Sequence, residues 1–478
     1  MRQLGFFGFT ALSLGSLALL ATSACAPAAS GKPAAGQTTA ASTTSSEGAS
    51  GASKAARPLP FIEDDYGRAL AEAKAKNKPL FVDGWAPWCH SCLSLKSYVL
   101  DTPQLRAEAD KFVWLALDSE KEKNGAYFAK YGLDALPTIW VIDPQTEKVS
   151  WKLVGTVTAP ELAKVLDDLA DTKAHTTGDL DTAFAEASRI DVHKDAPGAV
   201  RALEKVLAAA PRGWARRPEA LTSYVAALAW AKQPERCGEV ALREGTALPM
   251  SSYRVTIASV GTGCVEEQPK GSVARGYLAP LLKELTDIVH LPGRPILADD
   301  RSAAFEMLVS ALKADGKKDV AKQMASEWAA FLEGEAQRAP DAKGRAVFDA
   351  HRMLAYVELG DPARAIPMFT QSEHDFPEDY NPPARLGRTY FELKRYDEAL
   401  DAMSRAIGKA YGARKLRLYQ LKADIAAAKK DPDTERKTLD EALAFASTLS
   451  LREGYDRLRA QLAERRSKLG VGGTTAQR

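Results

Sequence analysis

The stretch Trp88-Cys89-His90-Ser91-Cys92 constrains the fold of this chain more than any other part of its sequence. Two cysteines at this spacing can close a small disulfide ring or open to a dithiol. A helix that begins at the first cysteine favours a thiolate there, because its free N–H groups and its macrodipole stabilise negative charge. The apolar residues Phe81 and Val82 and a turn precede the pair, as expected for a buried strand that leads into this helix. The spacing therefore predicts a redox centre.

Length and composition bound the rest of the chain. Its 478 residues are too many for one hydrophobic core, so we expect two to four domains. Hydrophobic residues make up 45% and charged residues 26%, which is ordinary for a soluble globular protein. A net charge of +2 provides no strongly basic face, so we expect no nucleic-acid partner.

The N-terminus is typical of an exported protein. Met1-Arg2 precede an apolar run over residues 6–20, and small residues follow, which is the pattern of a secretory signal. The segment 20–25 resembles the lipobox of bacterial lipoproteins, although Thr22 stands where that family usually has an aliphatic residue. The resemblance implies a signal peptide over residues 1–25 and lipidation of Cys25. The alternative is ordinary cleavage after Ala26, which would release a soluble periplasmic or secreted protein.

Residues 26–58 consist almost entirely of Ala, Ser, Thr, Gly and Pro, so we expect a disordered tether, and a disordered tail over residues 471–478. A tether of this kind suits a lipid anchor that holds a folded domain at a membrane. Because Ala26 rather than Asp follows Cys25, the lipoprotein resemblance implies the outer membrane of a bacterial envelope, facing the periplasm. In that oxidising compartment the remaining cysteines, Cys237 and Cys264, pair more often than they stay free. A structural disulfide between them is our expectation, with buried free thiols as the alternative.

A first folded domain is predicted over residues 59–172. Its pattern reads helix, strand, helix, strand, helix, two strands and a helix, which is an α/β layer arrangement with one sheet. The expected helices cover 65–76, 89–100, a short turn from 102, 124–131 and 160–169, and the expected strands cover 79–83, 112–118, 137–143 and 148–153.

This domain resembles the thioredoxin family. The run from Trp85 to Cys92 is similar to the active-site run of that family, and Asp83 falls where the family has a buried acid. The loop 131–138 resembles the one that carries the family's cis-proline, here Pro137, and Gly155 matches a glycine of the last strand. The lysine-proline start and the Asp-Pro-Gln stretch are most similar to the periplasmic C-terminal domain of DsbD-type reductases. The resemblance implies a protein thiol–disulfide oxidoreductase without a bound cofactor.

Each matching residue then has an expected role. Cys89, at the helix start, is the expected nucleophile, and Cys92, one turn deeper, resolves the mixed disulfide. Burial would raise the pKa of Asp83 and let it exchange a proton with Cys92, although a turn-forming role is the plainer alternative. Pro137, if cis, would present the backbone of Leu136 to a substrate; otherwise it is an ordinary proline at the start of a strand.

The residues around the cysteines leave the direction of electron flow open. His90 and Ser91 replace the glycine and proline of ordinary thioredoxin, and Trp114 stands where that family often has a lysine near the buried acid. A charged His90 would stabilise the Cys89 thiolate and make the couple more oxidising, whereas a His90 that points to solvent would do little. Trp88 is expected to form a lip around the ring and to contact partners.

No metal or haem site is expected. Zinc would need a second pair of ligands, and Leu93 follows the second cysteine where haem attachment would need histidine. The other histidines are scattered, and none is expected to be a ligand: His175, His193, His290, His351 and His374.

The second half, residues 179–470, is predicted to be all-helical. A pattern of four mostly apolar positions recurs after 34 residues: Tyr356, Leu359, Ala365 and Phe369 correspond to Tyr390, Leu393, Ala399 and Met403. That is the period of tetratricopeptide repeats, and we place two such units at about 346–413. Repeats of this kind either form a packed solenoid or also present a concave surface to a protein or peptide partner.

Two functions are compatible with these features. The first is an envelope thiol–disulfide oxidoreductase that acts on protein disulfides, with reductase or isomerase activity favoured over oxidase and with a helical-repeat interaction domain. Its redox partner is unknown. The alternative is a non-enzymatic scaffold or assembly lipoprotein in which the thioredoxin-like domain docks or senses redox state.

Overall fold

The computed structural model describes residues 58–133, 135–170, 179–449 and 453–471, all within one compact unit, Arg57–Arg478. The predicted signal peptide, lipidation site, tether up to residue 57 and tail from residue 472 lie outside these residues, and residue 471 ends the last helix. No helix among the described residues combines the length and the apolar character that crossing a bilayer requires. We call residues 58–170 the head and residues 179–471 the helical half.

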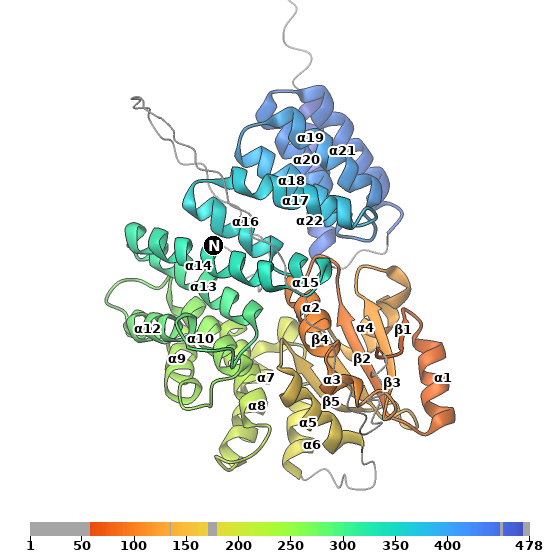
Figure 1. The fold of residues 1–478 in the computed structure, drawn as a ribbon, viewed down its shortest axis with the longest axis vertical. Helices are drawn as coiled ribbons and strands as arrows, with labels where there is room; N and C mark the ends of the chain where they lie inside the picture. The colour runs from red at the N-terminus through yellow and green to blue at the C-terminus, as the bar shows by residue number, and fades with distance from the viewer. Residues whose placement is uncertain (1–57, 134, 171–178, 450–452, 472–478) are drawn as a thin grey trace, which may run out of the picture. The chain divides into compact units, whose positions relative to one another are not determined.

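The head is built on a five-stranded sheet in the order β1-β3-β2-β4-β5 (Figure 1). The strands β1, β3 and β2 are parallel, and β4 and β5 run antiparallel to their neighbours. The elements are β1 (Phe61–Glu63), α1 (Tyr66–Lys76), β2 (Leu80–Trp85), α2 (His90–Leu95), the π-helical segment η1 (Lys96–Leu100), α3 (Pro103–Arg106), β3 (Val113–Asp118), the 3-10 helix η2 (Glu122–Asn124), α4 (Gly125–Tyr131), β4 (Thr138–Ile142), β5 (Val149–Val154) and α5 (Ala159–Ala170).

Both faces of this sheet are covered, as its apolar central strands require. Successive side chains of a strand point to opposite faces. Phe81 therefore packs with Leu95 and Leu162, on the side of α2 and α5, whereas Leu80 and Val82 pack on the other side with α1 and α4. The result confirms the predicted α/β layers.

Two local features differ from the expected elements. Strand β1 was not expected; its three residues are too few to show a period, and it pairs with β3 at the edge of the sheet. The expected helix 89–100 is present, but after Leu95 it continues as the π-helical segment η1. That segment carries Lys96, which is important for the site described below.

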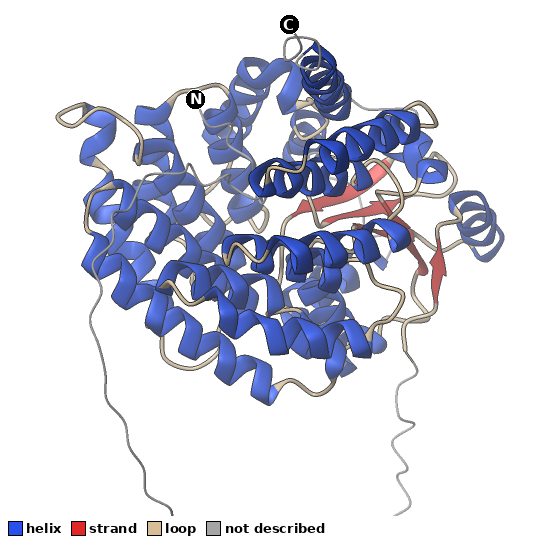
Figure 2. Ribbon diagram, turned by 90° about the horizontal axis from the view of Figure 1, so that it is seen from above, coloured by secondary structure: helices blue, strands red, loops and turns tan. Residues whose placement is uncertain are grey.

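In the part of the chain that the structure describes, strands occur only in the head, and the helical half has none (Figure 2). Its elements are α6 (Asp179–Ala187), α7 (Val192–Ala209), α8 (Arg217–Trp230), α9 (Pro234–Val240), η3 (Ala241–Gly245), α10 (Ser252–Val265), α11 (Val273–Gly276), α12 (Leu278–Val289), α13 (Ala298–Ala314), α14 (Lys318–Arg338), α15 (Ala342–Ala346), α16 (Asp349–Leu359), η4 (Pro362–Arg364), α17 (Ala365–Asp375), α18 (Asn381–Glu392), α19 (Tyr396–Lys409), α20 (Lys415–Lys429), α21 (Pro432–Ala446) and α22 (Glu453–Val471).

The helical half is not a separate appendage of the head. Tyr253 and Leu297, from the helical half, pack against the apolar core of the head. In return, Leu93 and Tyr98 of the head pack against the core of the helical half, and the hydroxyl of Tyr98 donates to the carbonyl of Gly344 at 3.0 Å. Shared packing on this scale fixes the start of α2 against helices from distant parts of the chain.

Candidate active site

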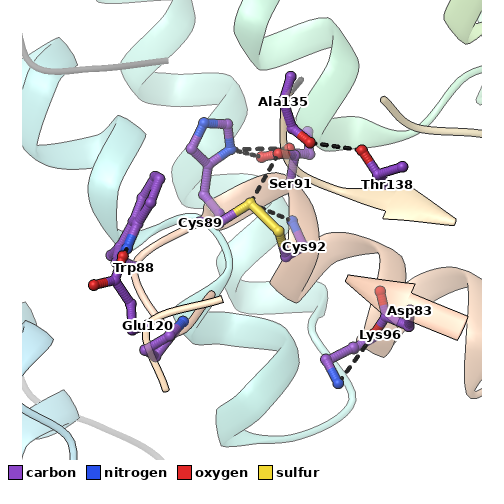
Figure 3. Close-up of a disulfide and its surroundings, with 12 residues drawn as sticks. Asp83, Trp88, Cys89, Ser91, Cys92, Lys96, Glu120, Ala135 and Thr138 are labelled. Atoms are coloured by element: carbon purple, nitrogen blue, oxygen red, sulfur yellow. Dashed lines mark hydrogen bonds and ion pairs between the residues drawn. A yellow bond between two sulfur atoms is a disulfide. The ribbon is translucent and has the colours of Figure 1, made fainter. Parts of the chain in front are cut away.

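The two cysteines of the redox ring lie at the start of α2. Cys89 caps the helix, and its Sγ accepts a hydrogen bond from the backbone N–H of Cys92 at 3.1 Å. The two sulfur atoms form a disulfide, and the hydroxyl of Ser91 lies 3.4 Å from Sγ of Cys89 (Figure 3). Cys89 is only 4% exposed and Cys92 is fully buried. A thiolate at Cys89 would therefore be stabilised by the helix start and shielded from bulk water.

A buried acid lies below the ring. Asp83, on β2, is fully buried, and Nζ of Lys96 lies 3.1 Å from its Oδ2 (Figure 3). Burial raises the pKa of Asp83 above its ordinary value, and Lys96 opposes that rise. Nζ of Lys96 also lies 4.1 Å from the centre of the Trp85 ring. The sequence showed Trp114 in place of a lysine near this acid; in the structure Lys96 supplies that positive charge from the redox helix itself.

The proline loop lies against the ring. The Leu136–Pro137 peptide bond is cis, and Leu136 packs with Ala86 and the two cysteines. The carbonyl of Pro137 accepts from the N–H of Gly155 at 2.9 Å, and this glycine adopts a positive φ of 101° that suits it. The loop and the last strand are thus held together beside Cys89.

The helical half covers the other side of the ring. The indole N–H of Trp88 donates to Oε1 of Glu120 at 3.0 Å, and the guanidinium of Arg414 stacks on its ring at 4.5 Å. The backbone N–H of Arg414 donates to Oε2 of Glu120 at 2.9 Å, and the side-chain amide of Asn381 donates to the carbonyl of Pro87 at 3.1 Å. Trp88 packs beside the cysteines, and it contacts Glu120 of the head as well as Arg414 and the apolar core of the C-terminal helices of the same chain.

His90 does not point to solvent. Its side chain is 13% exposed, and its Nδ1 lies 2.9 and 3.0 Å from the two carboxylate oxygens of Asp299 on α13. Of the two alternatives for His90, the solvent-facing one is therefore wrong, because the start of α13 covers this side chain. Burial alone would lower the pKa of His90, but Asp299 raises it above the ordinary value. The pKa of Asp299, fully enclosed, is lowered because His90 and His351 outweigh its burial.

A second histidine, on α16, joins this pair. The ring of His351 lies 4.0 Å from the ring of His90, so two histidines that are far apart in the sequence are adjacent in the fold. Among the described residues, His90, Asp299 and His351 bring nitrogen and oxygen atoms within 4.8 Å of one another. Both oxygens of Asp299 are hydrogen bonded to His90, and Nδ1 of His351 is 2.6 Å from the hydroxyl of Ser302. The geometry is that of a hydrogen-bonded ion-pair network.

The second disulfide has a different environment from that of the redox ring. Cys237 on α9 and Cys264 on α10, the expected structural pair, are joined within the apolar core of the helical half. The helices approach closely here: a Cβ at Gly238 would lie 2.8 Å from Cγ1 of Val265.

Known proteins resemble two parts of this chain. The family model of the thioredoxin-like domain matches residues 66–170. The chain contains a thioredoxin-like domain. A tetratricopeptide-repeat model matches residues 356–425, a range that overlaps the predicted units and extends into α20. The thioredoxin-like domain is therefore followed by an all-helical region with tetratricopeptide repeats, as predicted.

Individual relatives match the thioredoxin-like part. The thiol:disulfide interchange protein DsbD of Cronobacter sakazakii is 31% identical over 103 residues, which are 21% of this chain and 18% of that protein. A chloroplastic M-type thioredoxin of Brassica napus is 30% identical over 116 residues, 24% of this chain and 61% of that protein. The oxidised C-terminal domain of DsbD from Neisseria meningitidis is 24% identical, with 21% of this chain and 89% of that chain covered and a TM-score of 0.20. The chain thus spans less than a fifth of the length of the Cronobacter protein.

Proposed function

We propose that the Cys89–Cys92 pair performs thiol–disulfide exchange with protein partners. The observation that carries the proposal is a disulfide at the first turn of α2, above a buried acid, in a thioredoxin-like domain. The similarity to DsbD and to a chloroplastic thioredoxin supports the same chemistry.

Four side chains would carry the steps of the exchange. In the dithiol form, the Cys89 thiolate attacks a partner disulfide, forms a mixed disulfide and releases one partner thiolate, which takes up a proton. Cys92 then gives its proton to Asp83, and the resulting thiolate attacks Sγ of Cys89. The Cys89–Cys92 disulfide forms, the second partner thiol leaves, and two electrons have passed to the partner. Burial raises the pKa of Asp83, which favours its taking up a proton, and the charge of Lys96 opposes that rise.

The finer assignments belong to the same proposal. We favour a reductase or isomerase over an oxidase because of the likeness to DsbD, while a charged His90 acts in the opposite direction. We place the protein in a bacterial envelope, anchored through Cys25 and facing the periplasm, on the basis of its N-terminal sequence. The tetratricopeptide repeats support a protein or peptide partner for the helical half.

One observation favours a second candidate function. Cys89 is 4% exposed, and Trp88 beside it is held by Glu120 and Arg414. A protein disulfide that reacts with Cys89 must displace this cover. A thioredoxin-like domain that only docks on the repeats, or that reports redox state to them, could keep its disulfide ring covered by Trp88.

Trapping of partners distinguishes the two candidates. A Cys92→Ser protein retains Cys89 and cannot resolve a mixed disulfide, so it should accumulate in covalent complexes with envelope proteins that reductant releases. The matched control is Cys89→Ser combined with Cys92→Ser, which should trap nothing. A Cys92→Ser protein that forms no covalent complex in cells, although it is folded, would contradict the enzyme and favour the docking module.

A further inference from the structure

We propose that Asp299, supplied by the helical half, fixes the charge of His90 and thereby sets the redox potential of the Cys89–Cys92 couple. The inference rests on the proposed function, because it concerns the same disulfide. It makes Asp299 a positioning residue that acts through His90, and it assigns the helical half a part in the chemistry of the head.

The contact between His90 and Asp299 is specific. An ionised carboxylate can only accept, so the Nδ1 atom of His90 carries the proton that is shared between the two oxygens at 2.9 and 3.0 Å. The side chain of Asp299 is only 2% exposed. A buried carboxylate is costly unless a positive charge compensates it, and His90 is the hydrogen-bonded candidate for that charge.

The surroundings reinforce the pair. Glu306, also on α13, raises the pKa of His90 further, whereas Arg385 on α18 lowers it. His351 on α16 lies between the two acids: its Nδ1 is 3.8 Å from Oδ1 of Asp299 and its Nε2 is 3.4 Å from Oε2 of Glu306. Because the side chains of His90, Asp299 and His351 are largely buried, charge interactions among these three are stronger than they would be in water, whereas the side chain of Glu306 is partly exposed.

The consequence for the couple follows from the reaction that reduces it. A partner dithiol and the Cys89–Cys92 disulfide give the partner disulfide, a Cys92 thiol, a Cys89 thiolate and one released proton. His90 directly follows Cys89, so a positive His90 stabilises that thiolate and hence the reduced form. Loss of the Asp299 charge should leave His90 neutral in its buried site. The reduced form should then be less stable and the couple more reducing.

The test uses the adjacent residue as a matched control. Asp300 is also buried on α13 and also joins the two halves, since its two carboxylate oxygens accept hydrogen bonds from Thr156 of the head and from Ser252, each at 2.5 Å. The full chain, as Asp299→Asn and as Asp300→Asn, is equilibrated with glutathione buffers, and the Cys89–Cys92 redox state is measured by alkylation and mass spectrometry.

We expect Asp299→Asn to change the equilibrium constant by roughly tenfold towards the disulfide, or about 30 mV, and Asp300→Asn to leave it within experimental error. In a His90→Ala background, Asp299→Asn should have no further effect on the potential. In the protein that retains His90, Asp299→Glu keeps the carboxylate, so its potential should stay close to that of the unaltered protein. An unchanged potential in a folded Asp299→Asn protein would overturn the inference, as would an equal shift in Asp300→Asn or a shift towards more oxidising values.

Two further outcomes distinguish a failure of this inference from a failure of the proposed function. If the oxidised unaltered protein, whose Cys89 and Cys92 are tied in the disulfide, binds zinc and oxidised Asp299→Asn does not, the cluster of His90, Asp299 and His351 binds a metal ion and the ion-pair account is overturned. If the Cys89–Cys92 disulfide of the unaltered protein cannot be titrated at all, the proposed function itself fails. If the Cys89–Cys92 couple titrates normally but its potential is unchanged in Asp299→Asn, only this inference is refuted and the proposed function stands.

Discussion

The molecule contains two disulfides that are equally hidden from solvent and differ in almost everything else. Cys89 and Cys92 are 4% and 0% exposed, and Cys237 and Cys264 are 0% and 6% exposed. The first pair closes a ring within one helical turn and has the Asp83–Lys96 and His90–Asp299 pairs beside it. The second ties two helices together inside an apolar core. Burial therefore does not distinguish the two pairs; the first differs in its position at a helix start and in the two ion pairs beside it.

Removal of the nucleophile should have the largest effect. We expect Cys89→Ser to reduce disulfide reduction of a protein substrate by at least about 10³-fold, because no thiolate remains at the start of α2. Insulin reduction monitored by turbidity measures this. Cys264→Ser is the control from the other disulfide, and a comparable loss there would end the distinction between the two pairs.

The second disulfide should matter for stability instead. Replacing both Cys237 and Cys264 by serine should lower the free energy of unfolding by about 3 kcal/mol, since the loop of 27 residues that it closes becomes unrestrained in the unfolded chain. Urea unfolding followed by circular dichroism measures the change. Insulin reduction at a temperature where the variant is folded should stay at the level of the unaltered protein; a large loss of activity would mean that the pairs are coupled.

The buried acid should govern the second half of the exchange. Asp83→Asn removes the proton acceptor for Cys92, so we expect resolution of the mixed disulfide to slow by roughly a hundredfold while the first attack by Cys89 changes little. Stopped-flow measurement with a model disulfide separates the two steps. Glu108→Gln is a matched control, because Glu108 is also buried in the head and paired with a lysine, Lys111. Equal rates in both variants would assign Asp83 a structural role only.

The smallest expected effect is on the pH dependence of stability. The raised pKa of His90 adds stability that is present below its ordinary value of about 6.5 and is lost as the pH rises through the folded value. The lowered pKa of Asp299 adds stability that is present above about 3.9 and is lost as the pH falls through its folded value. Thermal unfolding of the unaltered protein and of Asp299→Asn should therefore differ most between about pH 4 and pH 6.5. A difference that grows at higher pH would contradict the ion pair.

The sequence determined the local part of the site and could not determine the long-range part. Asp83 and Pro137 were predicted because their distances from Cys89 along the chain match a known pattern, and Lys96 lies four residues after Cys92 in the sequence. Its pairing with Asp83 required the sheet. Asp299 follows His90 by 209 residues and lies on a helix without a distinctive motif, so no local signal could place it beside the ring.

The cover over the ring could not be predicted for the same reason. Trp88 was expected to contact partners, because in the sequence nothing near it competes for that surface. In the fold, Arg414 stacks on it from the loop before α20. The helical periods identified the helices of the second half, but periodicity does not show which helix packs on which domain.

The redox state of each cysteine pair in glutathione buffers tests the central claim most directly. The account predicts that Cys89–Cys92 titrates as a two-electron couple between about −270 and −120 mV, the range of thioredoxin and DsbA, while Cys237–Cys264 stays oxidised throughout. Alkylation with isotopically distinct reagents and mass spectrometry reads both pairs in one sample. If the two pairs were reduced together, or if Cys89–Cys92 remained a disulfide when the chain was folded, the account of a redox centre would be wrong.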